Sequence, residues 1–357
     1  MKDIKIIKTS NPSGPLDEDN LAFGKEFTDH MFMLDYEDGQ WSNARIVPFG
    51  NIELSPAAIA LHYGAEIFEG MKAFRRNDGK VQLFRPEINM QRLNDSAERL
   101  ALPTIDLDDS LEYLMEFIRH EERFVPSKEG ASLYIRPLMI GVDATLGVHP
   151  ATQALYIIMA SPSGPYYGKD GLKPVKIIIE NADVRAVRGG TGMAKCGGNY
   201  GAQIRASKKA FEKGFTEVLW LDGVERKYID EVGAMNVFFV IDGVVVTPEL
   251  TGAILSGVTR RRRSILELLR DQGYKVEERK ISVDELVQAL KEGKVEEAFG
   301  TGTAAVVSPI GQFTYGDVDY PVGDGNVGKI TKSLYDTITG IQRGKIEDKF
   351  GWTVELE

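Results

Sequence analysis

The sequence predicts a mixed α and β protein of two domains, and three observations lead to this prediction. A chain of 357 residues is long enough to bury two separate cores. Asp-Gly pairs beside apolar runs, the strongest short-range signal of a β-hairpin, occur in both halves. Residues 161–174 are rich in Gly, Pro and Ser and lie between two strand-like runs, as an interdomain linker would. We therefore expect a smaller α+β domain over residues 1–163, a linker over 164–174 and a larger α/β domain over 175–357.

Local patterns place the individual elements. The Asp-Gly pairs predict hairpin turns at residues 38–39, 78–79, 222–223 and 242–243. In the first half, Pro86 is placed to open one helix and Ser110 to cap the next. In the second half, Ser282 and Glu285 form a capping box, and residues 328–342 close the chain as an amphipathic helix.

Composition and charge narrow the classes of partner. The net charge is −10, so nucleic acid is not an expected partner. The one run of basic residues, at 260–263, is expected on a solvated or subunit-facing surface. The sequence shows no signal-peptide core and no apolar run of membrane-spanning length, which predicts a cytoplasmic protein without membrane partners.

Cysteine and histidine are too scarce for several kinds of site. The single cysteine, Cys196, excludes an internal disulfide framework and a multi-cysteine metal site. The histidines are not paired at ligand spacing, so zinc-dependent hydrolysis is not expected and no metal is predicted. They are His30, His62, His120 and His149.

The most informative segment is the glycine-rich stretch at residues 189–201. Six glycines surround Lys195, and Tyr200 follows five residues later. Glycine allows a ligand to approach the main chain closely, so this lysine is presented to a ligand or belongs to a plain surface loop. A phosphate-binding loop of the nucleotide type is excluded, because Lys195 lies between Ala194 and Cys196 rather than between Gly and Ser or Thr. A Schiff-base lysine remains as the chemical alternative.

Three further features favour a ligand, and each has a plainer alternative. Glu231, after Asp230 at the start of an apolar run, lies either at an exposed strand end or against a cationic ring nitrogen. Residues 255–260, which run into a helical pattern, and residues 299–304 form either a phosphate cup or ordinary caps and turns. Arg92 either extends along the surface or points inward at an anion.

Six blocks of sequence, spread in order over nearly the whole chain, match one family of enzymes. They are FEGMKAF at 68–74, LFRP at 83–86, SLYIRP at 132–137, the Lys195 segment, VLWL at 218–221 and EVGAMN at 231–236. These blocks resemble the branched-chain amino acid aminotransferases, which are fold-type IV pyridoxal phosphate enzymes with the D-amino acid aminotransferase-like fold. The resemblance implies a large domain built as a pseudo-barrel and a homodimer in which the partner subunit completes each site.

The resemblance also implies an activity and a cofactor. The activity is reversible transamination between L-leucine, L-isoleucine or L-valine and 2-oxoglutarate, which gives the branched-chain 2-oxo acid and L-glutamate. The cofactor is pyridoxal 5′-phosphate, with pyridoxamine 5′-phosphate as its intermediate form. Lys195 would form the Schiff base and act as the acid and base, for which its neutral form must be accessible. The implied partners are therefore small amino acids and 2-oxo acids.

Matching residue by residue assigns the cofactor contacts. Tyr200 corresponds to the tyrosine that hydrogen-bonds the phenolic oxygen, and Glu231 to the carboxylate on the pyridine nitrogen. Arg92 corresponds to the phosphate-binding arginine. The remaining phosphate contacts are implied for the amides of Val258 and Thr259 and the hydroxyl of Thr303.

The same matching assigns a substrate pocket that must accept both an aliphatic side chain and a carboxylate. Arg136 is implied for the distal carboxylate of glutamate, and the amides of Thr303 and Ala304 for the α-carboxylate. The other implied lining residues are Phe23, Tyr63, Phe68, Tyr134, Val148 and Tyr166.

The sequence departs from the family pattern at two places, and several other activities have to be weighed against branched-chain transamination. Ala305 and Ser308 stand where the animal enzymes carry a redox-active Cys-x-x-Cys, and Ala234 replaces a hydroxyl residue common in relatives. A D-amino acid aminotransferase or an aminodeoxychorismate lyase would also keep a lysine and a glutamate, but the blocks favour the branched-chain class. A nucleotide-binding oxidoreductase or kinase would need a glycine fingerprint that the sequence lacks. A non-catalytic binding protein would be expected to lack Lys195 or Glu231.

Overall fold

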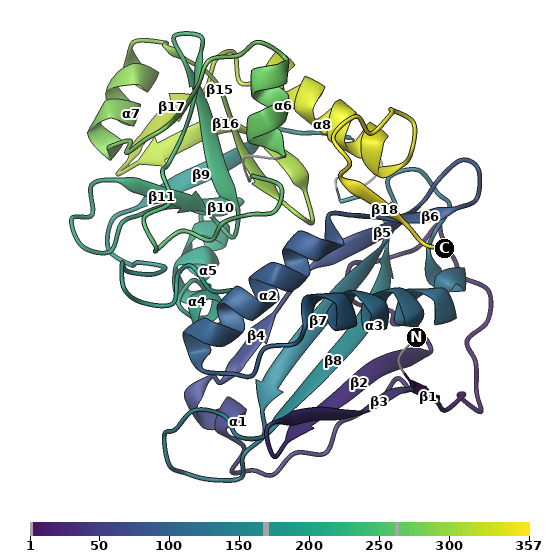
Figure 1. The fold of residues 1–357 in the computed structure, drawn as a ribbon. Coiled ribbons are helices and arrows are strands. Elements are labelled where there is room, and N and C mark those ends of the chain that lie inside the picture. The colour runs from purple at the N-terminus through teal and green to yellow at the C-terminus, as the bar shows by residue number, and fades with distance from the viewer. Residues whose placement is uncertain (1–2, 167–170, 261–263) are drawn as a thin grey trace. The chain divides into compact units, whose positions relative to one another are not determined.

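The computed structural model describes residues 3–166, 171–260 and 264–357. The chain forms two compact units (Figure 1). The first unit contains Met1–Tyr166, Ala194–Gly197 and Ile341–Glu357, and the second contains Tyr167–Met193 and Gly198–Gly340. The two units are therefore similar in size, and the short segment around Lys195 belongs to the first unit although most of its sequence neighbours belong to the second.

The first unit is built on one mixed sheet with the strand order β1-β3-β2-β8-β7-β5-β6-β18, and β4 pairs with β7. Its strands are β1 (Lys5–Ile6), β2 (His30–Glu37), β3 (Gln40–Pro48), β4 (Glu66–Phe68), β5 (Met71–Arg75), β6 (Val81–Phe84), β7 (Ser132–Gly141), β8 (Ala154–Ser163) and β18 (Thr353–Glu355). Its helices are α1 (Ile59–Tyr63), α2 (Pro86–Leu100), α3 (Leu107–His120) and the 3₁₀ turn η1 (Glu122–Phe124).

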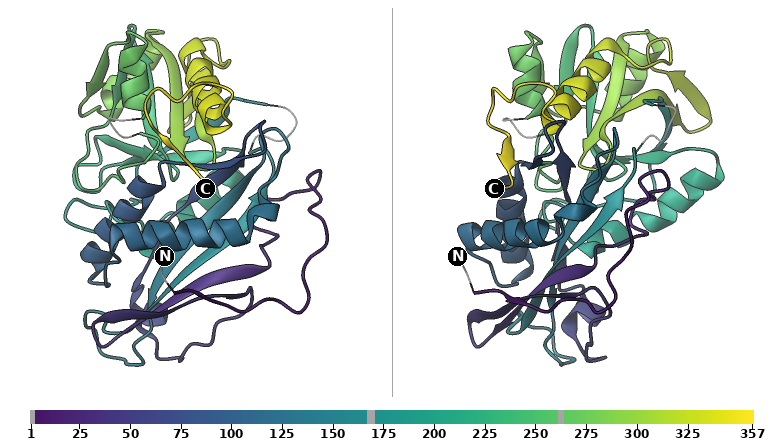
Figure 2. Two further views of the ribbon diagram at one scale, coloured as in Figure 1. Left: turned by 45° about the vertical axis from the view of Figure 1, so that its right-hand side comes forward. Right: turned by 90° about the vertical axis from the view of Figure 1, so that its right-hand side faces the viewer.

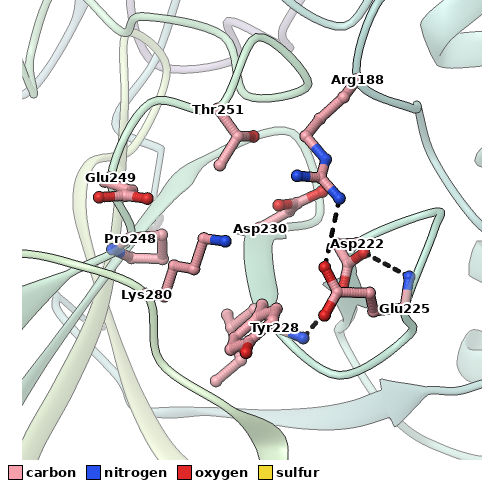
Figure 3. Close-up of a pocket in the computed structure, with 10 residues that line it drawn as sticks. Arg188, Asp222, Glu225, Tyr228, Asp230, Pro248, Glu249, Thr251 and Lys280 are labelled. Atoms are coloured by element: carbon pink, nitrogen blue, oxygen red, sulfur yellow. Dashed lines mark hydrogen bonds and ion pairs between the residues drawn. The ribbon is translucent and has the colours of Figure 1, made fainter.

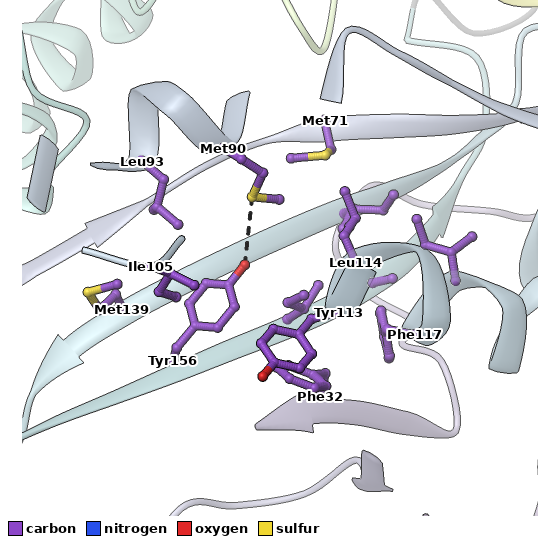
Figure 4. Packing of buried hydrophobic residues seen from close by; sticks show 14 of the residues in the cluster. Phe32, Met71, Met90, Leu93, Ile105, Tyr113, Leu114, Phe117, Met139 and Tyr156 are labelled. Carbon is purple, nitrogen blue, oxygen red and sulfur yellow. Dashed lines mark hydrogen bonds between the residues drawn. The ribbon is translucent and has the colours of Figure 1, made fainter. Parts of the chain in front are cut away.

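Helices α2 and α3 lie across the same face of this sheet (Figure 2). The buried cluster beneath them includes Leu93 from α2, Phe117 from α3, and Phe32 and Tyr156 from the strands (Figure 4). Phe32, Phe117 and Tyr156 have no exposed surface, and fully burying such a side chain stabilises the fold by about 1.5–3 kcal/mol. The result is a rigid base from which α2 presents its other side chains.

The second unit contains a sheet of order β11-β10-β9-β16-β15-β12-β13-β14, and β17 pairs with β16. Its strands are β9 (Val175–Glu180), β10 (Glu217–Leu221), β11 (Ile229–Val232), β12 (Asn236–Ile241), β13 (Val244–Thr247), β14 (Val276–Glu278), β15 (Val295–Gly302), β16 (Val306–Tyr315) and β17 (Val318–Pro321). The helices are α4 (Gly197–Gly201), α5 (Ile204–Glu212), α6 (Ile265–Asp271), α7 (Val283–Lys291) and α8 (Lys329–Gln342), of which the first and last cross the boundary between units.

The hairpin predictions are confirmed, because all four Asp-Gly pairs separate antiparallel neighbours. The pairs at 38–39 and 242–243 form tight turns with positive φ at both residues, as a type I′ turn requires. The pair at 222–223 opens a longer connection. There the Asp222 carboxylate accepts four backbone N–H groups, from residues 224, 225, 227 and 228.

The helix predictions hold with one exception. Pro86 opens α2, and Ser282 caps α7 by accepting the Glu285 N–H at 3.0 Å. Ser110 does not cap α3, because the helix begins one turn earlier and Asp106 accepts the Asp109 N–H at 3.1 Å. An aspartate preceding the apolar pattern was the better cap, and Ser110 is buried inside the helix instead.

The predicted domain limits are wrong at the C-terminus. Residues 341–357 belong to the first unit, because β18 pairs antiparallel with β6 and the Arg85 N–H donates to the Trp352 carbonyl at 2.7 Å. Pairing between strands about 270 residues apart leaves no local signal. The linker over 164–174 is described only in part, since residues 167–170 lie outside the described ranges.

The basic run at 260–263 is also described only in part, because residues 261–263 lie outside those ranges. Arg260 itself is 2% exposed and donates to the Pro248 carbonyl at 2.6 Å, so this arginine is not on a solvated surface. Among the helices of the described ranges, none has the length and apolar character needed to span a membrane.

Candidate functional site

Three hydrogen bonds fix the main chain at Lys195 to the first unit. The Lys195 N–H donates to Ser96 Oγ of α2 at 2.9 Å, and its carbonyl accepts the Phe68 N–H at 3.0 Å. The Gly197 N–H donates to the carboxylate of Glu66 on β4. The glycine-rich segment is therefore not a free surface loop at this point, since a helix and a strand hold it on both sides.

The side chain of Lys195 lies in an environment that favours its neutral form. Burial, and then the positive charge of Arg92, lowers the pKa of Lys195 to about 8, against the opposing pull of Glu69. Its Nζ lies 4.8 Å from the centroid of the Phe68 ring. A lysine with this pKa is partly neutral near physiological pH, as a nucleophilic or proton-transferring amine must be.

Beside Lys195, Glu69 and Arg92 form a buried ion pair in the first unit. Glu69 Oε1 accepts from Arg92 Nε at 2.6 Å, and Glu69 Oε2 accepts from Arg92 Nη2 at 2.8 Å. Glu69 is fully buried and Arg92 is 4% exposed, so the surface alternative for Arg92 is wrong. Burial tends to raise the pKa of Glu69, but Arg92 first, and then Lys195 and Asn89, hold it below its usual range.

An aromatic wall adjoins this charged cluster. The Arg136 guanidinium stacks 4.6 Å from the centroid of Phe68, and its Nη2 donates to the Tyr134 hydroxyl at 3.0 Å. Phe23 packs edge-on against Tyr134 with 4.8 Å between ring centroids. A Cβ at Gly70 would overlap the Tyr134 hydroxyl, so only glycine permits this approach.

Four of the expected substrate-pocket residues thus contact one another, and Phe68 among them contacts Lys195. They are Phe23, Phe68, Tyr134 and Arg136. Three others are strongly exposed: Tyr63 at 44%, Val148 at 81% and Tyr166 at 58%. Tyr63 donates its hydroxyl to the Leu146 carbonyl at 2.5 Å, which links α1 to the loop that carries Val148. The structure therefore does not bring Tyr63 or Val148 into contact with Lys195 within the first unit.

Glu231 is buried in the second unit, on β11. It is 3% exposed, so the alternative of an exposed strand end is excluded. Its Oε1 accepts from the Leu255 N–H at 3.0 Å and from Asn236 Nδ2 at 3.3 Å. Its Oε2 lies 2.9 Å from Arg185 Nε, but Nε makes no aligned hydrogen bond, so this contact is ionic and poorly directed.

Asn236 connects Glu231 to the segment expected to cradle a phosphate. Asn236 Nδ2 also donates to the Leu255 carbonyl at 2.9 Å, and its Oδ1 accepts the Gly257 N–H at 3.1 Å. A Cβ at Gly257 would overlap Asn236 Oδ1, so glycine is needed there. The carboxylate and residues 255–257 are thereby held in one network.

The segment expected to cradle a phosphate is tied to the start of α6. Residues 261–263 between them lie outside the described ranges, and α6 (Ile265–Asp271) is seven residues long. The Val258 carbonyl accepts from Ser264 Oγ at 2.8 Å, and the Thr259 carbonyl accepts the Ile265 N–H at 3.1 Å. The main chain at Val258 and Thr259 is thereby held against the first residues of this helix.

The remaining expected contacts also belong to the second unit. Tyr200 lies in α4, and Thr303 and Ala304 lie in the turn between β15 and β16, each half-buried. Thr259 is 8% exposed and Val258 is 5% exposed.

A small pocket lies beside Asp230 of β11 (Figure 3). Its lining includes Asp230, Arg188 and Lys280, and its volume is about 20 Å³, enough for a single water molecule. Burial, and then the neighbouring charge of Glu231, raises the pKa of Asp230 to about 7. This pocket is therefore too small to hold a cofactor or a substrate, but it contains a group that titrates near neutrality.

One cluster in the described part of the chain brings three possible metal ligands together: His30, His120 and Glu121. His30 Nε2 accepts the Thr9 N–H at 2.9 Å, which places the ring proton on Nδ1, 2.6 Å from Glu121 Oε1. A metal at Nδ1 would require that proton to move to Nε2, where the Thr9 N–H already points. The geometry is therefore that of a structural histidine–carboxylate hydrogen bond.

Comparison with known proteins identifies the family. The sequence model described as amino-transferase class IV matches residues 66–313. Branched-chain-amino-acid aminotransferase 2 of Bacillus subtilis is 50% identical over 354 residues, covering 99% of this chain and 97% of that protein. A branched-chain-amino-acid aminotransferase of Mycolicibacterium smegmatis is 47% identical, covering 94% of this chain and 92% of that protein.

Solved structures agree with this result. The Escherichia coli branched-chain amino acid aminotransferase has a TM-score of 0.76 at 30% identity, covering 92% of this chain and all of that one. The T.th. branched-chain amino acid aminotransferase, solved with pyridoxamine 5′-phosphate, has a TM-score of 0.75 at 28% identity, covering 91% of this chain and 98% of that one. The chain belongs to the class IV aminotransferase family. The fold expected from the sequence is confirmed.

Class IV aminotransferases depend on pyridoxal phosphate, and the buried groups of this chain suit that cofactor. An aldehyde requires an amine that can be neutral, which Lys195 provides. A phosphate dianion suits a guanidinium whose direction is fixed, as at Arg92. A pyridine nitrogen that is to stay protonated suits a buried carboxylate, as at Glu231.

Several residues that build these clusters were not assigned roles from the sequence. They are Glu66, Glu69, Asn89, Ser96, Arg185 and Asn236. Only Glu69 had a local signal, because it is a charged residue between Phe68 and Gly70 in a largely apolar run. Glu66, Asn89, Ser96 and Arg185 act through pairings across about 20 residues or more, for which a single sequence provides no local pattern. Asn236 lies five residues after Glu231 but also bonds residues 255 and 257.

Proposed function

We propose that this chain transfers the amino group of L-leucine, L-isoleucine or L-valine to 2-oxoglutarate, reversibly, through a Schiff base on Lys195. The observation that carries the proposal is the half-buried Lys195, with its pKa lowered to about 8, beside an aromatic wall that also holds a guanidinium. The names of the relatives that match almost the full length of the chain support the choice of branched-chain substrates.

In this proposal, seven residues hold the cofactor: Arg92, Lys195, Tyr200, Glu231, Val258, Thr259 and Thr303. When bound, pyridoxal phosphate supplies an electron sink for the bond that breaks at the substrate Cα. Lys195 Nζ would remove the Cα proton and return a proton to C4′ of the cofactor. Glu231 would keep the ring nitrogen protonated by offering it a negative charge in a buried environment. Arg92 would bind the phosphate.

The aromatic wall explains how one pocket can accept two kinds of side chain. Phe68 and Tyr134 offer apolar surface to an aliphatic group, and Arg136 lies against both rings, 4.6 Å and 5.4 Å from their centroids. In the second half-reaction Arg136 would bind the distal carboxylate of the five-carbon substrate. The full proposed substrate set is Phe23, Tyr63, Phe68, Tyr134, Arg136, Val148, Tyr166 and Ala304.

We further propose that the chain forms a homodimer in the cytoplasm, as expected from the sequence and its family resemblance. The strong exposure of Val148, Tyr63 and Tyr166 supports the dimer, since apolar and aromatic side chains assigned to a pocket are left open to solvent in the single chain. Light scattering of the purified protein should give twice the mass of 39.5 kDa. A monomer with full activity would contradict this part of the proposal.

The function is tested by spectroscopy and an amino-donor screen. The purified protein should be yellow, and its absorbance should change on addition of leucine, isoleucine or valine. Lys195→Ala should retain cofactor binding but lose turnover with 2-oxoglutarate by at least about 10³-fold. Lys208→Ala, which changes a 72% exposed lysine in the second unit, is the control and should remain active. Normal turnover by Lys195→Ala, or a protein that stays colourless with pyridoxal phosphate, would overturn the proposal.

A further inference from the structure

Glu69 is the most completely enclosed charge among the described residues of the first unit, and the proposed mechanism gives it no role. It has no exposed surface and lies at the start of the tight segment between β4 and β5. Two donors from Arg92 reach its carboxylate, at 2.6 and 2.8 Å. Asn89 Nδ2 donates to Oε2 at 2.7 Å, and the Gly70 N–H donates to the same oxygen at 3.2 Å.

Such a carboxylate is costly to bury, so its retention calls for a physical reason. A well-packed apolar pair of similar volume often stabilises a protein as much as a buried ion pair does. Four hydrogen bonds offset the desolvation of Glu69, and both partners Arg92 and Asn89 come from α2. The whole arrangement lies next to the lysine that performs the chemistry, which points to a role in the reaction.

We propose that Glu69 is a positioning residue of the reaction: its buried carboxylate aims the guanidinium of Arg92 and balances the charges of Arg92 and Lys195. This inference rests on the function proposed above for Arg92 and Lys195. It adds a residue that touches neither substrate nor cofactor and acts through both of these side chains.

The aiming follows from the geometry of the pair. A guanidinium is planar, and a carboxylate that engages Nε and Nη2 side-on fixes both the plane and the direction of the group. Asn89 in turn holds the carboxylate and also donates to the Gly70 carbonyl at 3.2 Å. The Glu69 N–H donates to the Pro137 carbonyl at 2.8 Å, which ties the main chain to β7. Arg92 therefore cannot rotate without breaking a network that joins α2, β7 and the segment between β4 and β5.

The charge balance concerns Lys195. Burial and the cations Arg92 and Arg136 all lower the pKa of Lys195, whereas Glu69 raises it. Glu69 thus limits how far the amine loses its proton in this cationic environment. Without the negative charge of Glu69, burial and the two arginines would lower the pKa of Lys195 further. A proton bound at the Lys195 nitrogen should then be lost at lower pH.

The test compares Glu69→Gln, Glu69→Asp and a matched control, all as holoenzyme. The readout is the pH titration of the visible absorption band, which reports the protonation of the Schiff-base nitrogen on Lys195. Glu69→Gln should move the midpoint down by about one pH unit. It should also weaken pyridoxal phosphate binding about tenfold, as a misaimed arginine would. Glu69→Asp keeps the charge but loses reach, so it should weaken binding while leaving the midpoint within about 0.3 unit.

The control is Glu121→Gln, which removes another buried carboxylate of the first unit, one that hydrogen-bonds His30. It should lower thermal stability without moving the midpoint. If Glu69→Gln does not fold, Asn89→Ala removes a bond that holds the carboxylate but keeps its charge, so it should weaken pyridoxal phosphate binding and leave the midpoint in place. When the wild-type protein responds to leucine, an unshifted midpoint in Glu69→Gln or unchanged cofactor binding in Asn89→Ala overturns the role of Glu69 alone. A wild-type protein with no visible band overturns the proposed function itself.

Discussion

Each unit of the molecule buries a glutamate against an arginine, and the two pairs differ in how they are joined. Glu69 and Arg92 in the first unit share two aligned hydrogen bonds. Glu231 and Arg185 in the second unit share a 2.9 Å contact without an aligned hydrogen bond, while backbone and Asn236 donors hold the carboxylate. A doubly bonded pair fixes a direction, whereas a loosely directed pair can exchange one cation for another. We infer that the first pair orients and the second receives the cationic ring nitrogen.

The largest expected loss of activity comes from a substitution in the second pair, Glu231 and Arg185. Glu231→Gln keeps the shape of the side chain but removes the charge that would hold the ring nitrogen protonated, so kcat/KM for leucine and 2-oxoglutarate should fall by about 10²–10³-fold. Glu217→Gln, at a half-buried carboxylate of the second unit, is the control and should lower kcat/KM by less than about fivefold. Activity of Glu231→Gln equal to that of the control would show that Glu231 serves only the fold.

A second prediction compares the two arginines directly. Lysine keeps the charge but cannot form the two-pronged bond, so Arg92→Lys should weaken pyridoxal phosphate binding by about 10–100-fold and lower the melting temperature. Arg185→Lys loses the bond from Nη2 to the Ala253 carbonyl but breaks no two-pronged pair with a carboxylate, so it should weaken pyridoxal phosphate binding less than Arg92→Lys. Fluorescence titration with the cofactor and thermal melts of both variants provide the measurements. Equal losses in the two variants would remove the distinction between the pairs.

A third prediction concerns the aromatic wall of the first unit. Arg136→Met keeps an apolar chain against Phe68 and Tyr134 but removes the positive charge. The KM for 2-oxoglutarate should therefore rise about tenfold, while the KM for leucine should change less than about threefold. Steady-state kinetics with each substrate varied in turn measures the difference. Matching increases for both substrates would mean that Arg136 only supports the wall.

The sequence predicted features that are encoded locally and missed those that depend on distant pairing. Asp38 and Gly39 adopt the two left-handed conformations of their turn because these residue types tolerate them wherever they occur. Strand β18, in contrast, pairs with β6, and no local pattern in its sequence indicates which strand it pairs with. The same holds for the site. Lys195 is conspicuous among glycines, but Ser96, which holds its N–H at 2.9 Å, resembles any other helix serine.

The smallest expected effect concerns Asp230, on the same strand as Glu231. Its pKa is raised to about 7 from 3.8, so between about pH 4 and 7 the folded protein binds a proton at Asp230 that the unfolded chain has lost. The free energy of unfolding therefore falls as pH rises through that window. Above pH 7 the full destabilisation by the ionised Asp230 carboxylate is present. From the size of the shift in the Asp230 pKa, this destabilisation is on the order of 2–4 kcal/mol.

Asp230→Asn should remove this pH dependence, since an amide stays neutral. The variant should gain stability over the wild type at pH 8 and lose most of that advantage near pH 4.5, as measured by denaturant unfolding at both pH values. Asp222→Asn is the matched control, because the pKa of Asp222 is shifted in the opposite direction from that of Asp230. Four backbone N–H groups offset burial and hold the pKa of Asp222 below its usual range, so that variant should lose stability at pH 8. If Asp230→Asn tracks the wild type at both pH values, then the carboxyl beside Glu231 is solvated in solution. In that case the second pair lies in a more polar environment than the first.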